Sequence, residues 1–285
     1  MRTSDAPAID LLSGSSVERI QHPEIVPLEV GDLWVDGAVI RVRMSEWGFV
    51  PALCRAIQIL HDGCGATPSN GPLVSAVSGF GAVFLTGGRA REDELRRDLS
   101  DQRWQIYFGT TGVFTGMSGG FALLDLLGVS GWVLDLGQTQ LKLATGTRLW
   151  TFPRDVRRLR ATSTVPLPEI PAQRRRLREF IAMKLRWVLA HGQPRPQALV
   201  VALPARLAED GTPITSDYAG LRGDRELIPD ALNLAGLPDV TAFVLNDAEL
   251  AAFSARTDPR LARFRKILVL TLGFGIGAAL VCRSS

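Results

Sequence analysis

The sequence predicts a mixed α/β protein built from two lobes. With 285 residues, the chain is long enough for more than one hydrophobic core. Its 46% hydrophobic and 21% charged residues are the proportions of a globular protein rather than a disordered one. Between residues 131 and 256, three short apolar stretches precede an alternation of helical and strand-like segments. That order is typical of strands and helices stacked in α/β layers.

Apolar runs bounded by turn residues predict the strands, and apolar residues repeating every three or four positions predict the helices. The turn residues Asp36 and Gly37 indicate a hairpin over residues 33–43. The other expected strands are 82–86, 105–108, 132–136, 141–144, 148–152, 198–203 and 240–245. The expected helices are 49–61, 73–78, 91–99, 116–127, 173–190, 224–235 and 248–254.

Residues 267–282 form a nearly continuous apolar run. The run has 16 residues, fewer than the ~20 that a helix needs to cross a bilayer. Its glycines and its strand-like beginning favour a strand, a tight turn and a second strand. We therefore expect no insertion into a membrane.

Charge and cysteine content limit the function classes further. The net charge of +3 is mildly basic and does not by itself call for nucleic acid. The first 20 residues carry acidic side chains and lack the apolar segment of a secretory signal. An odd, sparse set of cysteines predicts reduced thiols in the cytoplasm and no disulfide framework. These cysteines are Cys54, Cys64 and Cys282.

A glycine-bearing motif follows the apolar run at residues 132–134. Asp135, Gly137, Gln138, Thr139 and Lys142 fit the pattern D-x-G-x-T-x-x-K. Glycine permits a tight hairpin, and the amides and threonine hydroxyl of such a loop can bind phosphate oxygens. The aspartate can hold Mg²⁺ through water, and the lysine can neutralise phosphate. The alternative is a plain hairpin with Gly137 and Gln138 at its tip.

A second candidate lies where the expected strand 240–245 meets the next helix. Asn246 and Asp247 stand at this junction. Ligands of open α/β sheets bind at the carboxyl ends of strands, and phosphoryl transfer to a hydroxyl needs a carboxylate base. Asp247 is therefore a candidate catalytic base. The alternative is a helix cap, a position that asparagine and aspartate also favour.

Two further glycine loops follow apolar strands. Gly273, Phe274, Gly275 and Gly277 form a G-x-G-x-G loop whose amides can face phosphates, or else a bulge in a tightly packed sheet. Earlier in the chain, Gly87–Gly88 follows the expected strand 82–86 and precedes a helix, where backbone can lie against adenine and ribose. An ordinary strand–helix turn is the alternative for this loop.

The three loops together resemble the two phosphate loops and the adenosine loop of the sugar kinase, heat-shock chaperone and actin (ASKHA) superfamily. In that superfamily the adenosine loop comes last, whereas here it comes first. The resemblance implies a two-lobed actin/hexokinase-like (ribonuclease H-like) fold that is circularly permuted. Residues 129–262 would form the first lobe, and residues 1–128 plus 263–285 the second.

The segment around Asn246 and Asp247 resembles the ROK family (repressors, open reading frames and kinases). That resemblance implies that Asp247 is the catalytic base and that Asn246 contacts a sugar. Residues 217–223 resemble the family's sugar loop, with Asp217 in place of its asparagine and Gly220 presenting backbone groups. The segment 18–22 resembles its "GE-GH" motif, which makes His22 a candidate sugar contact or a structural residue. The family's cysteine-rich zinc segment is not found in the sequence.

The resemblance implies an enzyme that uses ATP and Mg²⁺ to phosphorylate a sugar-like hydroxyl. One alternative is an actin-like ATPase that polymerises into filaments, and dimerisation is a further form of self-association. Another is a degenerate nucleotide-binding regulator, because Phe274, Ala205 and Asp217 depart from the family's pattern. Nucleic acid is not an expected partner, since no helix-turn-helix precedes the kinase-like part. The arginines of helix 173–190 predict a solvated face or a surface for an acidic partner.

Overall fold

The computed structural model describes residues 16–28, 34–35, 38–39, 49–62, 78–88, 97, 99, 104–109, 114–137, 139–146, 148–155, 166–215, 220–272 and 276–284. This part of the chain is mixed α/β with several sheets and helices, as the sequence predicts. It forms two compact units. Unit 1 comprises Met1–Ile20 and Gly120–Asp247, and unit 2 comprises Gln21–Gly119 and Ala248–Ser285.

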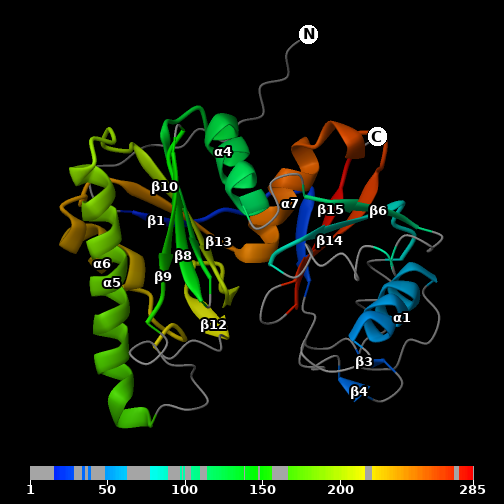
Figure 1. The fold of residues 1–285 in the computed structure, drawn as a ribbon, viewed down its shortest axis with the longest axis horizontal. Coiled ribbons are helices and arrows are strands. Elements are labelled where there is room, and N and C mark those ends of the chain that lie inside the picture. Colours follow the sequence, from blue (N-terminus) through cyan, green and yellow to red (C-terminus); the bar gives the residue numbers. More distant parts are fainter. Residues whose placement is uncertain are drawn as a thin grey trace. The chain divides into compact units, whose positions relative to one another are not determined.

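A six-stranded sheet forms the centre of unit 1, with the order β1-β13-β10-β7-β8-β9 (Figure 1). β7, β8 and β9 form an antiparallel meander, whereas β10, β13 and β1 continue the sheet parallel to β7. The strands are β1 (Val17–Arg19), β7 (Gly131–Leu136), β8 (Gln140–Ala144), β9 (Leu149–Pro153), β10 (Ala198–Leu203) and β13 (Thr241–Asn246). The hairpins β7–β8 and β8–β9 and the strands β10 and β13 agree with the expected elements to within one residue.

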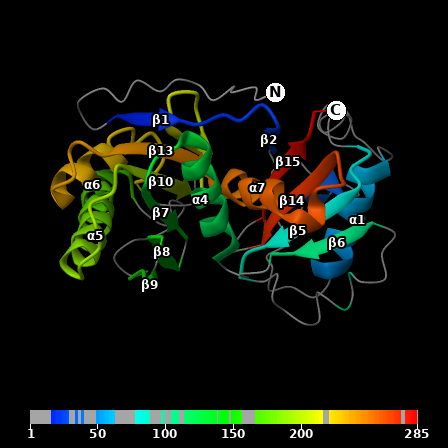
Figure 2. The same ribbon diagram turned by 90° about the horizontal axis from the view of Figure 1, so that it is seen from above.

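Two helices cover one face of this sheet. α5 (Ile170–Ala190), which follows a short 3-10 turn at Leu167–Glu169, lies beside α6 (Leu227–Ala235) (Figures 1 and 2). The buried side chains of α5 recur at helical spacing and pack against β7, β8, β10 and β13. They are Leu177, Ile181, Ala182, Leu185 and Val188. Burying each larger apolar side chain contributes about 1.5–3 kcal/mol, so this face anchors the helix.

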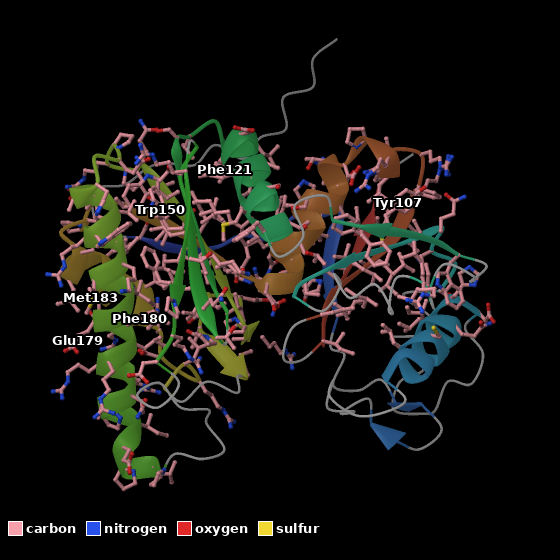
Figure 3. All side chains as sticks on the ribbon, viewed as in Figure 1. Tyr107, Phe121, Trp150, Glu179, Phe180 and Met183 are labelled. Carbon is pink, nitrogen blue, oxygen red and sulfur yellow. The ribbon has the colours of Figure 1, made fainter. Side chains whose placement is uncertain are left out.

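The other edge of α5 stays near the surface. Phe180 is partly buried, and Met183 is 52% exposed on the same helix (Figure 3). Trp187 packs edge-on against Trp150 and Phe152 of β9 and stacks on His191. These aromatic contacts join the end of the helix to the edge strand of the sheet.

A five-stranded sheet forms the centre of unit 2, with the order β2-β15-β14-β5-β6. Its strands are β2 (Ile25–Leu28), β5 (Ala82–Thr86), β6 (Gln105–Phe108), β14 (Lys266–Leu272) and β15 (Ile276–Cys282). α1 (Phe49–Asp62) packs Leu53, Ile57 and Leu60 into the core of this unit. The short strands β3 (Trp34–Val35) and β4 (Ala38–Val39) pair antiparallel, as expected for the hairpin at Asp36 and Gly37.

The two sheets share one pattern of strand order and direction. In unit 2, β14, β15 and β2 form an antiparallel meander, and β5 and β6 continue it parallel to β14. In unit 1, β7, β8 and β9 form the corresponding meander, and β10 and β13 continue it parallel to β7. A helix stands between the third and fourth strands in each case, α5 in unit 1 and α1 in unit 2. The unit 2 pattern is rotated along the chain, because its third strand, β2, precedes the other four.

The chain passes from one unit to the other within α4 (Thr115–Leu127), after Gly119, and within α7 (Asp247–Thr257), after Asp247. The parts of these helices that belong to unit 2 pack closely, and a Cβ on Gly119 would lie 2.0 Å from the carbonyl oxygen of Leu250. The hydroxyl of Ser254 donates to the carbonyl of Thr115 in the same contact. Within unit 1, a Cβ on Gly120 would lie 2.4 Å from the Cγ1 of Val133 on β7.

The structure differs from the expected organisation at several short elements. Within unit 1, β1 pairs with β13, and residues 248–257 of α7 belong to unit 2. β1, β11 (Arg206–Leu207) and β12 (Pro213–Thr215) were not expected, because two or three residues carry no periodic signal. Of the expected helix 91–99, Arg97 and Leu99 are helical, and residues 73–77 lie outside the described residues. Among described residues, no helix is long and apolar enough to cross a membrane.

Candidate functional site

Polar residues gather where three parallel strands of unit 1 end. Asp135 on β7 is the register partner of Ala202 on β10, and Leu203 of β10 is the partner of Asn246 on β13. Asp247 follows directly as the first residue of α7. With strands spaced about 4.8 Å apart, Asp135 and Asn246 lie on the order of 10 Å from each other along one edge of the sheet. The carboxyl edge of a parallel sheet is where α/β proteins bind ligands.

Asp135 and Lys142 form an ion pair across the β7–β8 hairpin. They are register partners on the two antiparallel strands, and the Lys142 Nζ lies 2.6 Å from the Asp135 Oδ2. Their side chains are only 17% and 15% exposed, respectively. The expected phosphate-binding motif therefore has its two charged residues in contact with each other.

The hairpin between them is tight. A Cβ on Gly137 would lie 2.9 Å from the carbonyl oxygen of Gln140, which explains the requirement for glycine. Thr139 is exposed, and its carbonyl accepts a hydrogen bond from the backbone N–H of Arg154 at 2.8 Å. Gln138 lies outside the described residues.

The donor set at this edge fits magnesium rather than a metal held by the protein alone. No group of three or more histidine, cysteine or acidic residues gathers among the described residues, so a closed metal cage is not found there. Mg²⁺ usually keeps several waters and takes one or two carboxylates plus the phosphates of its substrate. Asp135 supplies one such carboxylate, with a second, Asp247, further along the same edge.

Asn246 has a structural partner. Its Nδ2 donates to the carbonyl oxygen of Ala205 at 2.8 Å, which ties the end of β13 to the turn that follows β10. This amide hydrogen bond was not expected from the sequence, where Asn246 is a candidate sugar contact. Because α7 begins at Asp247, Asn246 stands at the cap position that the sequence offered for Asp247, and Asp247 lies in the first helical turn at the edge of the sheet.

The expected sugar loop is held by arginines of α5. Gly220 has a φ of 88°, and its carbonyl accepts a hydrogen bond from the Arg174 Nε at 3.2 Å. The Arg174 Nη2 also donates to the carbonyl of Arg222 at 2.7 Å. A Cβ on Gly220 would lie 2.9 Å from the backbone nitrogen of Arg174, so the loop passes very close to the helix. Asp217 lies outside the described residues.

A second arginine extends this contact. Arg178, one turn after Arg174, pairs with the buried Asp224 and, through Nη1 at 2.7 Å, with Asp230 of α6. The solvated face expected for the arginines of this helix is therefore wrong for Arg174 and Arg178. Sequence reasoning missed them because their partners lie more than 40 residues away. Their i, i+4 spacing beside the buried Leu177 was the only available signal.

In unit 2, the expected loop at Gly87–Gly88 adjoins the end of β14. Gly87 has a φ of 97°, and a Cβ there would lie 2.4 Å from the carbonyl oxygen of Leu272. The chain after β5 therefore passes against the end of β14, and Gly88 next to it has open space around its Cα. Gly277 pairs with Thr271 on the neighbouring strand. Gly273, Phe274 and Gly275 lie outside the described residues.

His22 also belongs to unit 2. Its Nδ1 accepts a hydrogen bond from the backbone N–H of Glu24 at 3.2 Å, and its ring meets the Phe253 ring edge-on. Burial and the charge of Arg256 lower the pKa of His22 below its ordinary value, against the opposing effect of Glu24. The histidine is therefore neutral near pH 7, with its remaining proton on Nε2, where it can donate to a ligand.

Of the expected site residues, the structure brings Asp135, Lys142, Asn246 and Asp247 to one edge of the unit 1 sheet. In unit 2 it brings together Gly87 and the end of β14. Comparison of the chain with protein-family models, with curated proteins and with solved structures gave no match.

Proposed function

We propose that the chain is a circularly permuted member of the actin/hexokinase-like superfamily that uses Mg²⁺·ATP to phosphorylate a sugar-like hydroxyl. The supporting observation is the shared strand pattern of the two sheets. In each sheet a glycine-containing segment joins the first two strands of the meander, at Gly137 between β7 and β8 and at residues 273–275 between β14 and β15. Equivalent glycine hairpins in two equivalent sheets are the arrangement that the resemblance implies for two phosphate loops.

Each candidate residue has a role in this proposal. Amides near Gly137 and the Thr139 hydroxyl hold phosphate oxygens, and residues 273–277 hold phosphate from the second sheet. Asp135 would hold Mg²⁺, which would supply positive charge beside the transferred phosphoryl group. Gly87–Gly88 lies against the adenosine. Asp247 accepts the proton of the attacking hydroxyl. Positioning of the reactants and stabilisation of charge account for most of the rate enhancement in such a reaction.

The first test is release of ADP from Mg²⁺·ATP, with and without a panel of monosaccharides, over a range of protein concentrations. We expect one class of sugar to stimulate release, because the acceptor hydroxyl completes the reacting pair. That result would also name the acceptor class. A rate of ADP release that no sugar changes would contradict the proposed phosphotransferase activity.

Asp247 offers a matched pair of variants. Asp247→Ala removes the carboxylate and its polar contacts at the start of α7, whereas Asp247→Asn keeps a polar side chain of the same size and removes only the base. We expect both variants to lose phosphoryl transfer by at least about a hundredfold, and to bind ATP nearly as the parent does. Activity retained in Asp247→Asn would assign the residue to a structural role at the start of α7. ATP affinity is measured by calorimetry on the same preparations.

A second candidate function is an actin-like ATPase that assembles into filaments. The observation that favours it is the bond from the Asn246 amide to Ala205, since one of the two N–H donors of this amide is already used within the protein. An ATPase activates water and needs no sugar contact at this position. Pelleting that requires ATP and rises steeply with protein concentration would support this candidate, and a sugar-dependent ADP release would oppose it.

A further inference from the structure

We propose that Lys142 is an internal counter-ion that keeps Asp135 from holding a divalent cation until nucleotide phosphates draw the ammonium group away. This inference rests on the proposed function and deepens it. It assigns Lys142 two alternative partners, the carboxylate of Asp135 in the free protein and phosphate in the complex. It therefore predicts that metal and nucleotide bind together and that metal alone binds weakly.

The first support is the geometry of the pair. The Nζ–Oδ2 distance of 2.6 Å is that of a short charge-assisted hydrogen bond. The register of β7 and β8 places Asp135 opposite Lys142, so the contact is built into the hairpin and needs no loop to form it. Both side chains are largely buried. Limited exposure raises the effective strength of the pair above that of a surface salt bridge.

The second support is the chemistry of the competing cations. The ammonium group occupies one carboxylate oxygen and neutralises the charge that would attract Mg²⁺. A divalent ion that arrives alone must displace a cation from Asp135 and then remain beside it. A lysine is a compact charge on a flexible four-carbon stem, so it can turn from a carboxylate to a phosphate. Phosphate oxygens thus remove the obstacle and also supply ligands to the metal.

Thermodynamic linkage gives the consequence. If nucleotide relieves the competition at Asp135, it raises metal affinity, and metal must raise nucleotide affinity by the same factor. Removing the lysine charge should therefore change the two affinities in opposite directions. Metal alone should bind more tightly, and the metal–nucleotide complex more weakly. A lysine with only a structural role would not produce this reversal of sign.

The first experiment measures binding of Mn²⁺ alone, by the paramagnetic resonance signal of the free ion, to the full chain. We expect Lys142→Gln to bind Mn²⁺ about tenfold more tightly than the parent, because one nearby positive charge has been removed. Lys142→Arg keeps the charge and should bind as weakly as the parent. The double variant Asp135→Asn/Lys142→Gln should lose the gain, which locates it at Asp135. Equal Mn²⁺ affinity in the parent and Lys142→Gln overturns the inference.

The second experiment titrates Mn²⁺ in the presence of a non-hydrolysable ATP analogue. We expect the analogue to raise Mn²⁺ affinity of the parent about tenfold or more, and Lys142→Gln to weaken binding of the Mn²⁺·analogue complex. Thermal unfolding checks that each variant folds. If a variant does not fold, the titration of the parent protein still measures the coupling between Mn²⁺ and nucleotide binding. A parent with no nucleotide binding contradicts the proposed function, whereas the metal-alone comparison still decides the counter-ion role. Absence of coupling in a parent that binds nucleotide overturns the inference.

Discussion

At the scale of single residues, His22 is the most informative titratable group. Its Nδ1 is bonded to the backbone, its ring is half-buried, and Arg256 faces it. Glu24 is the other charged neighbour. Burial raises the pKa of Glu24, but the hydrogen bonds from Arg256 and from the backbone of Ser284 outweigh it, so that pKa is lowered overall. Glu24 therefore has a pKa below its ordinary value of 4.5.

The lowered pKa of His22 predicts a pH-dependent stability. Because the unfolded chain binds the proton more readily, the contribution of neutral His22 is complete above the unfolded pKa of about 6.5. It is lost as pH falls through 6.5 towards the lower folded pKa. We expect the urea midpoint to fall between pH 7.5 and pH 5 more in the parent than in His22→Gln. Parallel curves for the two proteins would contradict this prediction, and changes below pH 4.5 would report Glu24 instead.

At the scale of elements, the close contact of α4 and α7 depends on small residues. Gly119 meets the backbone of Leu250 on the facing helix, and no side-chain rotation can relieve an added Cβ there. Gly116, one turn earlier, would place a Cβ 3.3 Å from the Cδ2 of Leu250, at the end of a flexible side chain. An added methyl group should therefore destabilise the protein more at Gly119 than at Gly116.

The matched pair Gly119→Ala and Gly116→Ala tests this contact. Alanine favours a helix over glycine by about 1 kcal/mol at either position. At Gly119 the clash with backbone should exceed this gain and lower the free energy of unfolding by about 1–3 kcal/mol. Gly116→Ala should be neutral or stabilising, because the Leu250 side chain can shift. Denaturant unfolding of both variants measures the difference, and equal stability would show that the helices separate without cost.

At the scale of the whole molecule, the two sheets repeat one pattern in a rotated chain order. The end of β15 lies beside the beginning of β2, because the N–H of Cys282 donates to the carbonyl of Glu24 at 2.7 Å. The backbone N–H of Ser284 also lies 3.4 Å from the Glu24 carboxylate. The third strand of this sheet is thus adjacent in space to the second, although the two are distant in sequence.

This arrangement predicts that a repermuted chain folds. A protein that begins at Gly131, joins Ser285 to Met1 through a flexible linker and ends at Ser130 keeps every strand pair of both sheets. Packed contacts, rather than the place of the termini, determine stability in such permutants. We expect the same circular dichroism spectrum and a Tm within about 10 °C of the parent. A chain without cooperative unfolding would contradict the equivalence of the two sheets.

The sequence alone determined the local elements and the candidate motifs. Long apolar strands such as β10 and β14 and the periodic helix α5 could be predicted, because periodicity and turn residues are local signals. The glycine loops were found for the same reason. The short strands β1, β11 and β12 were missed, since pairing with a neighbouring strand and not their own composition makes them strands.

Only the tertiary structure decided the partners. It brought β1 into the unit 1 sheet, turned Arg174 and Arg178 towards the loop that begins at Gly220, and bonded Asn246 to Ala205. It also set Lys142 against Asp135 through the register of a hairpin. Which side chains meet depends on register and on the packing of elements far apart in the chain. These contacts form only when the strands and helices pack together, and local propensity does not specify which distant residue becomes the neighbour.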